Sequence, residues 1–363
     1  MFLVCFCIKM SVNKDHNTRA LTRIFNNTVA TYKYYWFISI IDIFVKKQRN
    51  KISFWEIIIG MIAEAWYPIH YFRLSFGKSD SLYKQIILLQ KELNVPIDAE
   101  KEVIKNQIKE NLNDPRVKNL LQVFTLNVPY RFLSPWINYS SDAEVVFHSQ
   151  SYKNDCLYAI KGKTIELNPG WLDFISDNYL ILRDFAFLNL TIFLQRRNPN
   201  VPDLPSKLVK PIIRDSLIKQ RHFWDIFIEI NGAFECIYTG KELKKKEYAL
   251  DHFIPWSYVS HNLIWNLLPA DSSINSSKNN NLPLLDKYLP PFAKIHQKAI
   301  RIIYPKNPNN KLLEDYLVLH NSISDLIRFS DDDFLKVYKN TFNPMVQIAE
   351  NMGFKYWKNS IYL

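Results

Sequence analysis

One stretch of the sequence, residues 236–283, holds the side chains whose types and spacing could carry out a reaction. Asp251 and His252 are adjacent in it, and Asn275 follows later. An imidazole can take a proton from water near neutral pH, and carboxylate and amide oxygens are hard donors suited to a partly hydrated Mg²⁺ or Mn²⁺. Phosphodiester hydrolysis needs such a base, a cation that neutralises the phosphate, and help for the departing oxygen. The stretch therefore predicts metal-assisted phosphodiester chemistry, with His252 as the base and Asp251 and Asn275 as metal ligands.

The elements that must position these residues can be read from the same stretch. YALDHFIP is typical of a short strand, and because successive strand side chains point to opposite faces, Asp251 and His252 can serve different roles. A polar loop follows, and NLLPA is typical of a second short strand. A helix is expected to begin near Ser272, with Asp271 as its N-cap. The predicted order is strand, loop, strand, helix.

The spacing of five residues is the most specific signal in the chain. Asn266 follows His252 by 14 residues, Asn275 follows Asn266 by nine, and Lys278 follows Asn275 by three. The order Asp-His, Asn, Asn, Lys at this spacing resembles the HNH endonuclease family, and in particular the HNH domain of RNA-guided CRISPR nucleases. The resemblance covers about 48 residues and implies a ββα-metal fold.

The resemblance also implies a role for each matching position. His252 would be the general base, Asp251 and Asn275 would bind one divalent metal, Mg²⁺ or Mn²⁺, and Asn266 would hydrogen-bond the loop and orient His252. Lys278 would contact a phosphate. Amides and hydroxyls near a helix start also bind anions, which makes three neighbours candidate nucleic-acid contacts: Ser276, Ser277 and Asn279.

The cysteines argue against a structural zinc ion. Many HNH proteins carry two C-x-x-C pairs around this fold, but here CIYTG keeps only Cys236, with Thr239 at the second position, and no cysteine follows. Tetrahedral zinc needs four good donors, so we expect no structural zinc and a module held by packing. No disulfide framework is expected either, because the four cysteines form no C-x-x-C pair and two of them, Cys5 and Cys7, lie in the first ten residues; the fourth is Cys156.

Several neighbouring side chains allow two interpretations. The position of His261 in the loop before Asn262 favours a loop-stabilising role over that of a metal ligand. We expect Trp256 and Trp265 to fill the core beneath the loop rather than to stack on bases. The run Lys244, Lys245 and Lys246 fits a solvated turn and a phosphate-backbone contact equally well.

The rest of the chain is expected to be mostly helical. Apolar residues recur at helical spacing from about residue 17 to 113, which predicts an all-helical first domain. NDCLYAIKGKTIELN predicts a hairpin that turns at Lys161-Gly162-Lys163. Helices are expected over about 171–196 and 208–230, separated by the break NPNVPDLP, and again after Pro283.

We therefore expect an α+β, mostly helical chain in four parts. They are a helical N-terminal domain (1–120), a mixed hairpin-plus-helix connector (121–230), the HNH module (231–287) and a helical C-terminal region (288–363).

Composition limits the classes of function. The chain of 363 residues is 48% hydrophobic, enough for a substantial core. Its 7 glycines form no phosphate-binding loop, which disfavours nucleotide-triphosphate and dinucleotide chemistry. A net charge of +11 suits a polyanionic partner but also fits solvated surfaces. The apolar run 52–72 contains Glu56, Glu64 and Pro68, which favours a buried helix over a membrane span, and we expect a cytoplasmic protein with no membrane partner.

These observations predict a metal-dependent endonuclease that hydrolyses DNA, with a role in prokaryotic defence against foreign DNA or in restriction. Two alternatives stay open. One is a nucleic-acid-binding subunit of a larger assembly, whose cleavage is silent or activated by a partner; the other is an RNA-directed nuclease. The helical regions could supply a protein partner surface or a homodimer interface.

Overall fold

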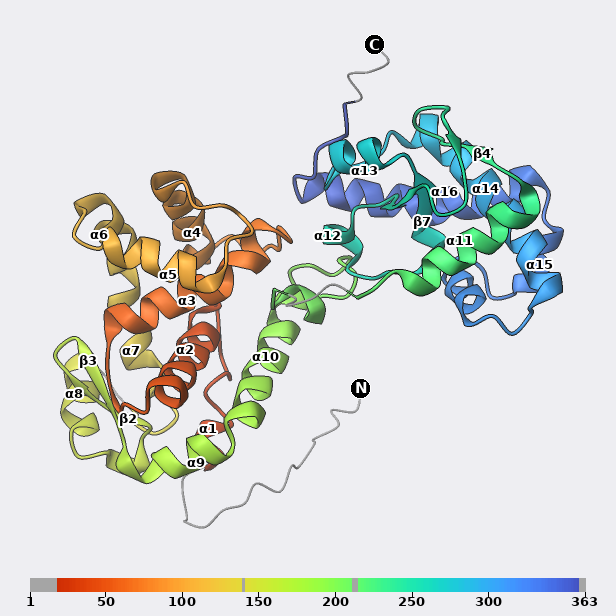
Figure 1. Ribbon diagram of the computed structural model, residues 1–363. Helices are drawn as coiled ribbons and strands as arrows, with labels where there is room; N and C mark the ends of the chain where they lie inside the picture. Colours follow the sequence, from red (N-terminus) through yellow and green to blue (C-terminus); the bar gives the residue numbers. More distant parts are fainter. Residues whose placement is uncertain (1–17, 139–140, 211–214, 359–363) are drawn as a thin grey trace. The chain divides into compact units, whose positions relative to one another are not determined.

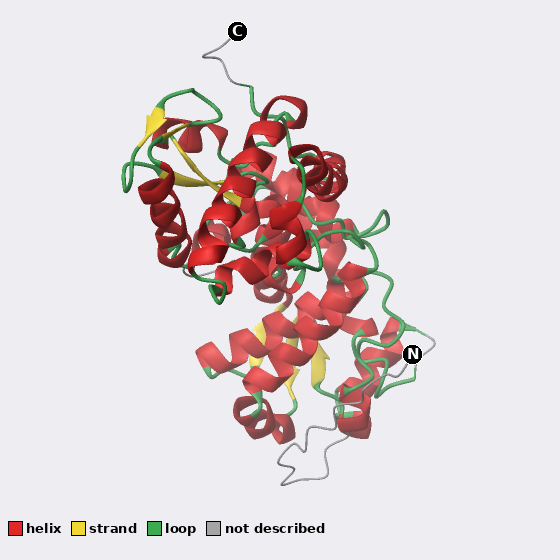
Figure 2. Cartoon of the chain, turned by 90° about the vertical axis from the view of Figure 1, so that its right-hand side faces the viewer, coloured by secondary structure: helices red, strands yellow, loops and turns green. Residues whose placement is uncertain are grey.

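The computed structural model describes residues 18–138, 141–210 and 215–358. Cys5, Cys7 and the apolar opening decamer therefore lie outside the described residues. Helices make up most of the chain and strands only a small part (Figure 2), which confirms the expected mostly helical α+β class. None of the described helices has the length and apolar character needed to cross a membrane.

The chain forms two compact units, which are considered separately. Unit 1 is Met1–Pro199 with Lys207–Lys210, and unit 2 is Asn200–Ser206 with Pro211–Leu363. The chain first passes from unit 1 to unit 2 within the break NPNVPDLP, between Pro199 and Asn200, and Lys207–Lys210 belong to unit 1 again. The segment with the candidate site, 231–287, belongs to unit 2 together with the C-terminal helices.

Unit 1 is built around two buried helices, α2 (Tyr32–Lys47) and α3 (Phe54–His70), which pack against each other (Figure 1). Gly60 of α3 permits this close approach, because a Cβ at that position would lie 2.9 Å from Oγ of Ser39 on α2. α10 (Tyr179–Gln195) packs on α2. The smaller helices of the unit are α1 (Thr18–Leu21), α4 (Ser81–Leu93), α5 (Lys101–Glu110), α6 (Pro115–Gln122), α7 (Val128–Arg131), α8 (Asp142–Ser149) and α9 (Leu172–Asp177).

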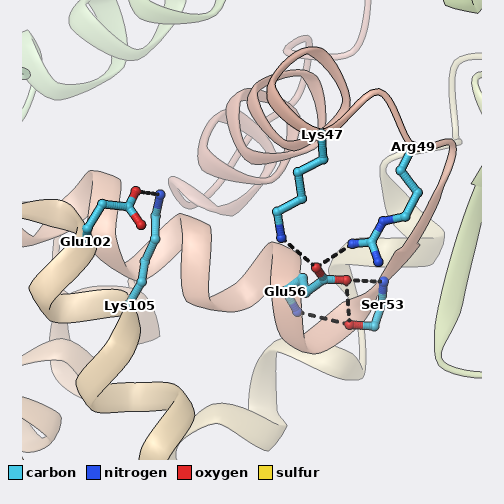
Figure 3. A network of polar contacts seen from close by, with 6 residues as sticks. All are labelled: Lys47, Arg49, Ser53, Glu56, Glu102 and Lys105. Atoms are coloured by element: carbon cyan, nitrogen blue, oxygen red, sulfur yellow. Dashed lines mark hydrogen bonds and ion pairs between the residues drawn. The ribbon is translucent and has the colours of Figure 1, made fainter.

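A capping box fixes the start of α3. The Ser53 hydroxyl accepts a hydrogen bond from the Glu56 backbone N–H, and the Glu56 carboxylate accepts one from the Ser53 N–H. The same carboxylate pairs with Lys47 and Arg49 (Figure 3). The helix is buried along most of its length. This agrees with the expectation of a buried helix rather than a membrane span.

Unit 1 also contains a three-stranded antiparallel sheet in the order β1-β3-β2. β2 (Tyr158–Lys161) and β3 (Thr164–Leu167) form the predicted hairpin, with Lys161 opposite Thr164 across the turn. The edge strand β1 (Lys51–Ser53) pairs Ile52 with Ile165. The expectation of an all-helical first domain was therefore wrong at this point, because the short run between α2 and α3 completes the sheet.

Two expected helices also have different bounds. The helix expected over 171–196 is interrupted at Asn178, which separates α9 from α10. The helix expected from residue 208 begins at Ile218, as α11 (Ile218–Asn231). The described residues of 121–149 carry short helices.

Unit 2 packs the candidate module and the C-terminal helices around one core. α11 packs on α14 (Leu285–Lys306), and α14 packs on α16 (Asp331–Asn351) (Figure 1). The rings of Phe253 and Phe292 have centroids 4.1 Å apart, and Trp265 packs edge-on against Phe342. Trp265 is thus a core residue, whereas Trp256 is half-buried. The shorter elements are β4 (Phe234–Glu235), β5 (Glu242–Leu243), α12 (Trp256–Val259) and α15 (Ile323–Arg328).

Candidate active site

The predicted strand, loop, strand and helix are present in unit 2. β6 (Ala249–His252) pairs antiparallel with β7 (Leu267–Ala270), so that Asp251 lies opposite Leu268 and His252 opposite Leu267. α13 (Ser272–Lys278) follows and packs against β6. Asp271 is its N-cap, as expected: the carboxylate accepts a hydrogen bond from the Ser273 N–H. This ββα arrangement brings the end of β6 and the face of α13 together.

His252 ends β6 with its ring half-buried and held by Asn262. The distance from His252 Nε2 to Asn262 Oδ1 is 2.9 Å. An amide oxygen only accepts hydrogen bonds, so Nε2 carries the proton in this contact, and in the neutral ring the lone pair lies on Nδ1. The contact therefore selects one tautomer, the one in which Nδ1 can accept a proton from water.

The loop that carries Asn262 is fixed from two sides. Gln220 of α11 donates a hydrogen bond to the Asn262 carbonyl oxygen at 2.9 Å. The Ile264 N–H donates to the Asp315 carboxylate at 2.8 Å. Both anchors come from outside the ββα elements, so neighbouring helical segments of unit 2 support the position of the His252 ring.

Asn266 is fully buried, with 0% of its surface exposed, and holds the chain just after β6. Its side chain accepts from the Ile254 N–H at 2.8 Å and donates to the Ile254 carbonyl at 2.9 Å. Its own carbonyl accepts from the Phe253 N–H. The expected loop contact of Asn266 is thus present, but the expected orientation of the imidazole comes from Asn262. Asn262 was missed because no motif spacing marks it.

Asp251 lies beneath the surface, with 2% exposure, and each carboxylate oxygen has a partner. Oδ1 accepts from Lys278 Nζ at 3.0 Å, and Oδ2 accepts from the Tyr238 hydroxyl at 2.7 Å. Burial, and then the neighbouring carboxylate, raise the pKa of Tyr238, so the phenol stays a proton donor. Asp251 is therefore a hydrogen-bonded carboxylate fixed in one orientation.

The position of Lys278 corrects an expectation. Its side chain has 0% exposure and also donates to the His252 carbonyl oxygen at 2.6 Å, so it forms a buried ion pair instead of a phosphate contact at the surface. Burial lowers the pKa of Lys278, and Asp251 opposes that shift. The physical reason is that a buried ammonium requires a carboxylate partner. A signal was present in the sequence, because Lys278 follows the buried Ile274 by four residues and shares its helix face.

The donors available for a metal are Asp251 and Asn275. Asn275 is half-buried on α13, and its side chain has no hydrogen bond within the described part of the chain. The same described residues contain no cluster of three or more His, Cys, Asp and Glu that could hold a metal ion. Mg²⁺ commonly takes only one or two protein carboxylates and completes its shell with water and substrate phosphates. A carboxylate has about four lone-pair sites, of which Tyr238 and Lys278 use two. The donor types, a carboxylate and an amide oxygen, therefore suit a partly hydrated divalent ion.

The other expected nucleic-acid contacts lie on or near α13. Ser276, Ser277 and Asn279 are exposed. The two serine hydroxyls donate to carbonyl oxygens of their own helix, those of Ser272 and Ile274. The exposed run 244–246 lies between β5 and β6, and one of its lysines, Lys245, pairs with Glu229 at 2.7 Å. The two serine hydroxyls keep acceptor lone pairs, and Lys244 and Lys246 bring positive charge to the exposed turn between β5 and β6.

Hydrogen bonds and burial hold the turn that begins at Cys236. The Cys236 carbonyl accepts from the N–H groups of Thr239 and Gly240, and its sulfur, which is buried, accepts from the Asp271 N–H at 3.5 Å. Tyr238 lies in this turn, and its hydroxyl donates the hydrogen bond to Asp251. The turn thus connects the first hairpin of the module to both β6 and α13.

Comparison with known families identifies the module. Residues 236–284 match the family model of the HNH endonucleases, which confirms the resemblance found in the sequence. The match indicates a nuclease that acts on nucleic acid, and HNH nucleases generally use a divalent metal ion. No curated protein and no solved structure matches the chain.

Proposed function

We propose that this protein is a metal-dependent HNH endonuclease that hydrolyses DNA phosphodiester bonds. The observation that carries the proposal is the His252 ring, held by Asn262 in one tautomer at the end of β6, a strand that packs against α13, the helix that carries Asn275. The nuclease module is short, and most of the chain lies outside it. Such an organisation fits a role in prokaryotic defence against foreign DNA, or in restriction.

The chain's own residues supply the proton chemistry. His252 accepts a proton from the attacking water at Nδ1, while Asn262 holds the proton on Nε2 and stabilises the imidazolium that forms. Asn266 keeps the backbone after β6 in place, so the ring cannot swing away with the loop. The resemblance to HNH nucleases implies products with a 5′-phosphate and a 3′-hydroxyl.

Asp251 and Asn275 would hold the metal ion, Mg²⁺ or Mn²⁺. Bound there, the ion would neutralise the phosphate and assist the departing oxygen. Tyr238 and Lys278 fix the Asp251 carboxylate, which limits the reorganisation that metal binding requires.

The test is cleavage of supercoiled plasmid by wild type and by His252→Ala, with Mg²⁺, with Mn²⁺ and with EDTA. We expect nicking or linearisation that requires metal, and a loss of at least about 10²-fold in the variant, the usual scale for removing a general base. His222→Ala is the matched control, because His222 is an exposed histidine of the same unit. A His252→Ala variant that cleaves as wild type does would refute the assignment.

Two further arms separate the alternatives. Preferential cleavage of RNA in a mixture of both nucleic acids would support the RNA-directed nuclease. Salt-sensitive binding without cleavage under any metal condition would support a binding subunit that is silent or needs a partner.

A further inference from the structure

A second candidate site lies in unit 1, in a cavity of about 560 Å³ that the nuclease module does not use. Its volume falls in the range of roughly 300–1,000 Å³ that is usual for small-molecule sites. Three cationic residues line it: Arg23 from the turn after α1, Lys33 from the first turn of α2, and Arg131 from the end of α7. Segments separated by about a hundred residues thus bring three positive charges to one hollow.

Within the described part of the chain, these three cations have no acidic partners. The residues known to line the cavity include no Asp or Glu, and none of the three cations forms an ion pair with a described residue. Some other basic residues of unit 1 do form ion pairs: Lys47 and Arg49 contact Glu56, and Lys105 contacts Glu102 (Figure 3). Burial, and then repulsion by Arg131, lower the pKa of Lys33, which shows that like charges lie close together. A bound anion would relieve this repulsion.

The remaining lining groups also suit an anion. α2 is 16 residues long and begins at the cavity, with no side-chain cap at its first turn and no acidic residue in it. A carboxylate already lies at this helix start, because Asp80 accepts a hydrogen bond from the Thr31 N–H at 2.7 Å, so the helix end adds little to the three cations. Asn26, Asn27 and Asn127 add amide donors.

We propose that this cavity binds a phosphorylated small molecule with at least two negative charges, of about the size of a nucleotide. A small ligand fits better than a nucleic-acid backbone because the three cations converge on one hollow rather than follow a line. The proposal does not depend on the nuclease function.

The experiment is calorimetric titration of the full chain, in EDTA, with inorganic pyrophosphate and with adenosine triphosphate. We expect saturable binding of both, and a loss of affinity of about tenfold or more in Lys33→Gln and in Arg131→Gln, since each substitution removes a charge-assisted contact. Lys84→Gln is the matched control: Lys84 is exposed on α4 of the same unit, away from the cavity. Thermal melting checks that the variants fold.

Tighter binding of the triphosphate than of pyrophosphate would indicate that the site also contacts the nucleoside. Equal affinity would indicate that the site recognises phosphate alone. Both results support the proposal. Three outcomes would overturn it. They are no saturable binding of either compound, affinities unchanged in both cavity variants, or a single-stranded oligonucleotide that binds more tightly than either compound and loses affinity in the same variants.

Discussion

Asn262 reaches the His252 ring from a loop whose course depends on one backbone conformation. The short helix α12 ends at Ser260, which adopts a left-handed conformation (φ 57°) and turns the chain toward Asn262. The sequence predicted a polar loop here and no helix. Asp251, His252 and Asn275 could be read from residue types and spacing, but the Asn262 contact depends on where the loop turns, and no periodicity records that.

The tautomer argument predicts how Asn262 variants behave. Asn262→Ala should lower the turnover number for DNA cleavage by about tenfold, because the ring loses its fixed tautomer, while KM stays near the wild-type value. Asn262→Asp keeps an acceptor and should restore much of the rate, but the rise of the pH–rate profile should move to higher pH, because a carboxylate favours the imidazolium.

The measurement is kcat and KM for plasmid nicking as a function of pH, with His261→Ala as a control from the same loop. A purely structural role for Asn262 would lower the rate of both variants alike and leave the pH profile in place.

At the scale of elements, the ββα order was predictable because each part has a local signal. Short apolar runs mark β6 and β7, and Asp271 marks the start of α13. β1 could not be predicted, because three residues between two long apolar helices gain strand character only by pairing with β3. The late start of α11 was missed although Pro211 disfavours a helix that begins at residue 208.

The link between α13 and β6 leads to a stability prediction. Lys278→Gln should lower the free energy of unfolding by about 3–5 kcal/mol, because it leaves the Asp251 carboxylate buried without its cation. Asp251→Asn combined with Lys278→Gln should recover a large part of that loss, since neither side chain then carries a charge. Urea unfolding of the two single variants and the double variant measures the coupling. Additive effects would contradict this account of the pair.

At the scale of the whole molecule, the match to residues 236–284 covers only part of unit 2. The buried core of that unit also draws on Phe292 of α14 and Phe342 of α16. The apolar faces of the C-terminal helices could be read from their spacing, but their packing against the nuclease module could not, because partner faces are chosen by shape complementarity. The cavity in unit 1 could not be predicted from the sequence either, because its three cations come close together only when the chain is folded.

One histidine in each unit, half-buried His70 and fully buried His296, makes the stability of that unit sensitive to acid. In unit 2, burial lowers the pKa of His296 to about 3, and in unit 1, burial lowers the pKa of His70 to about 4. Above the unfolded value of about 6.5 each ring is neutral in both states and has no effect on the pH dependence. Below that value the unfolded chain binds a proton that the folded unit does not, so stability falls with pH until the folded pKa is reached.

His296 therefore predicts the acid response of unit 2. Between pH 6.5 and 4 its contribution should lower the free energy of unfolding by about 1.4 kcal/mol per pH unit. His296→Gln should remove that part of the slope, even if the loss of its hydrogen bond with the Tyr316 hydroxyl lowers stability at pH 7. Hydrogen exchange of α14 peptides in urea reports unit 2 separately from unit 1, with His222→Gln as an exposed control. An unchanged slope in His296→Gln would mean that other groups set the acid response, since the ring would then be protonated alike in the folded and unfolded states.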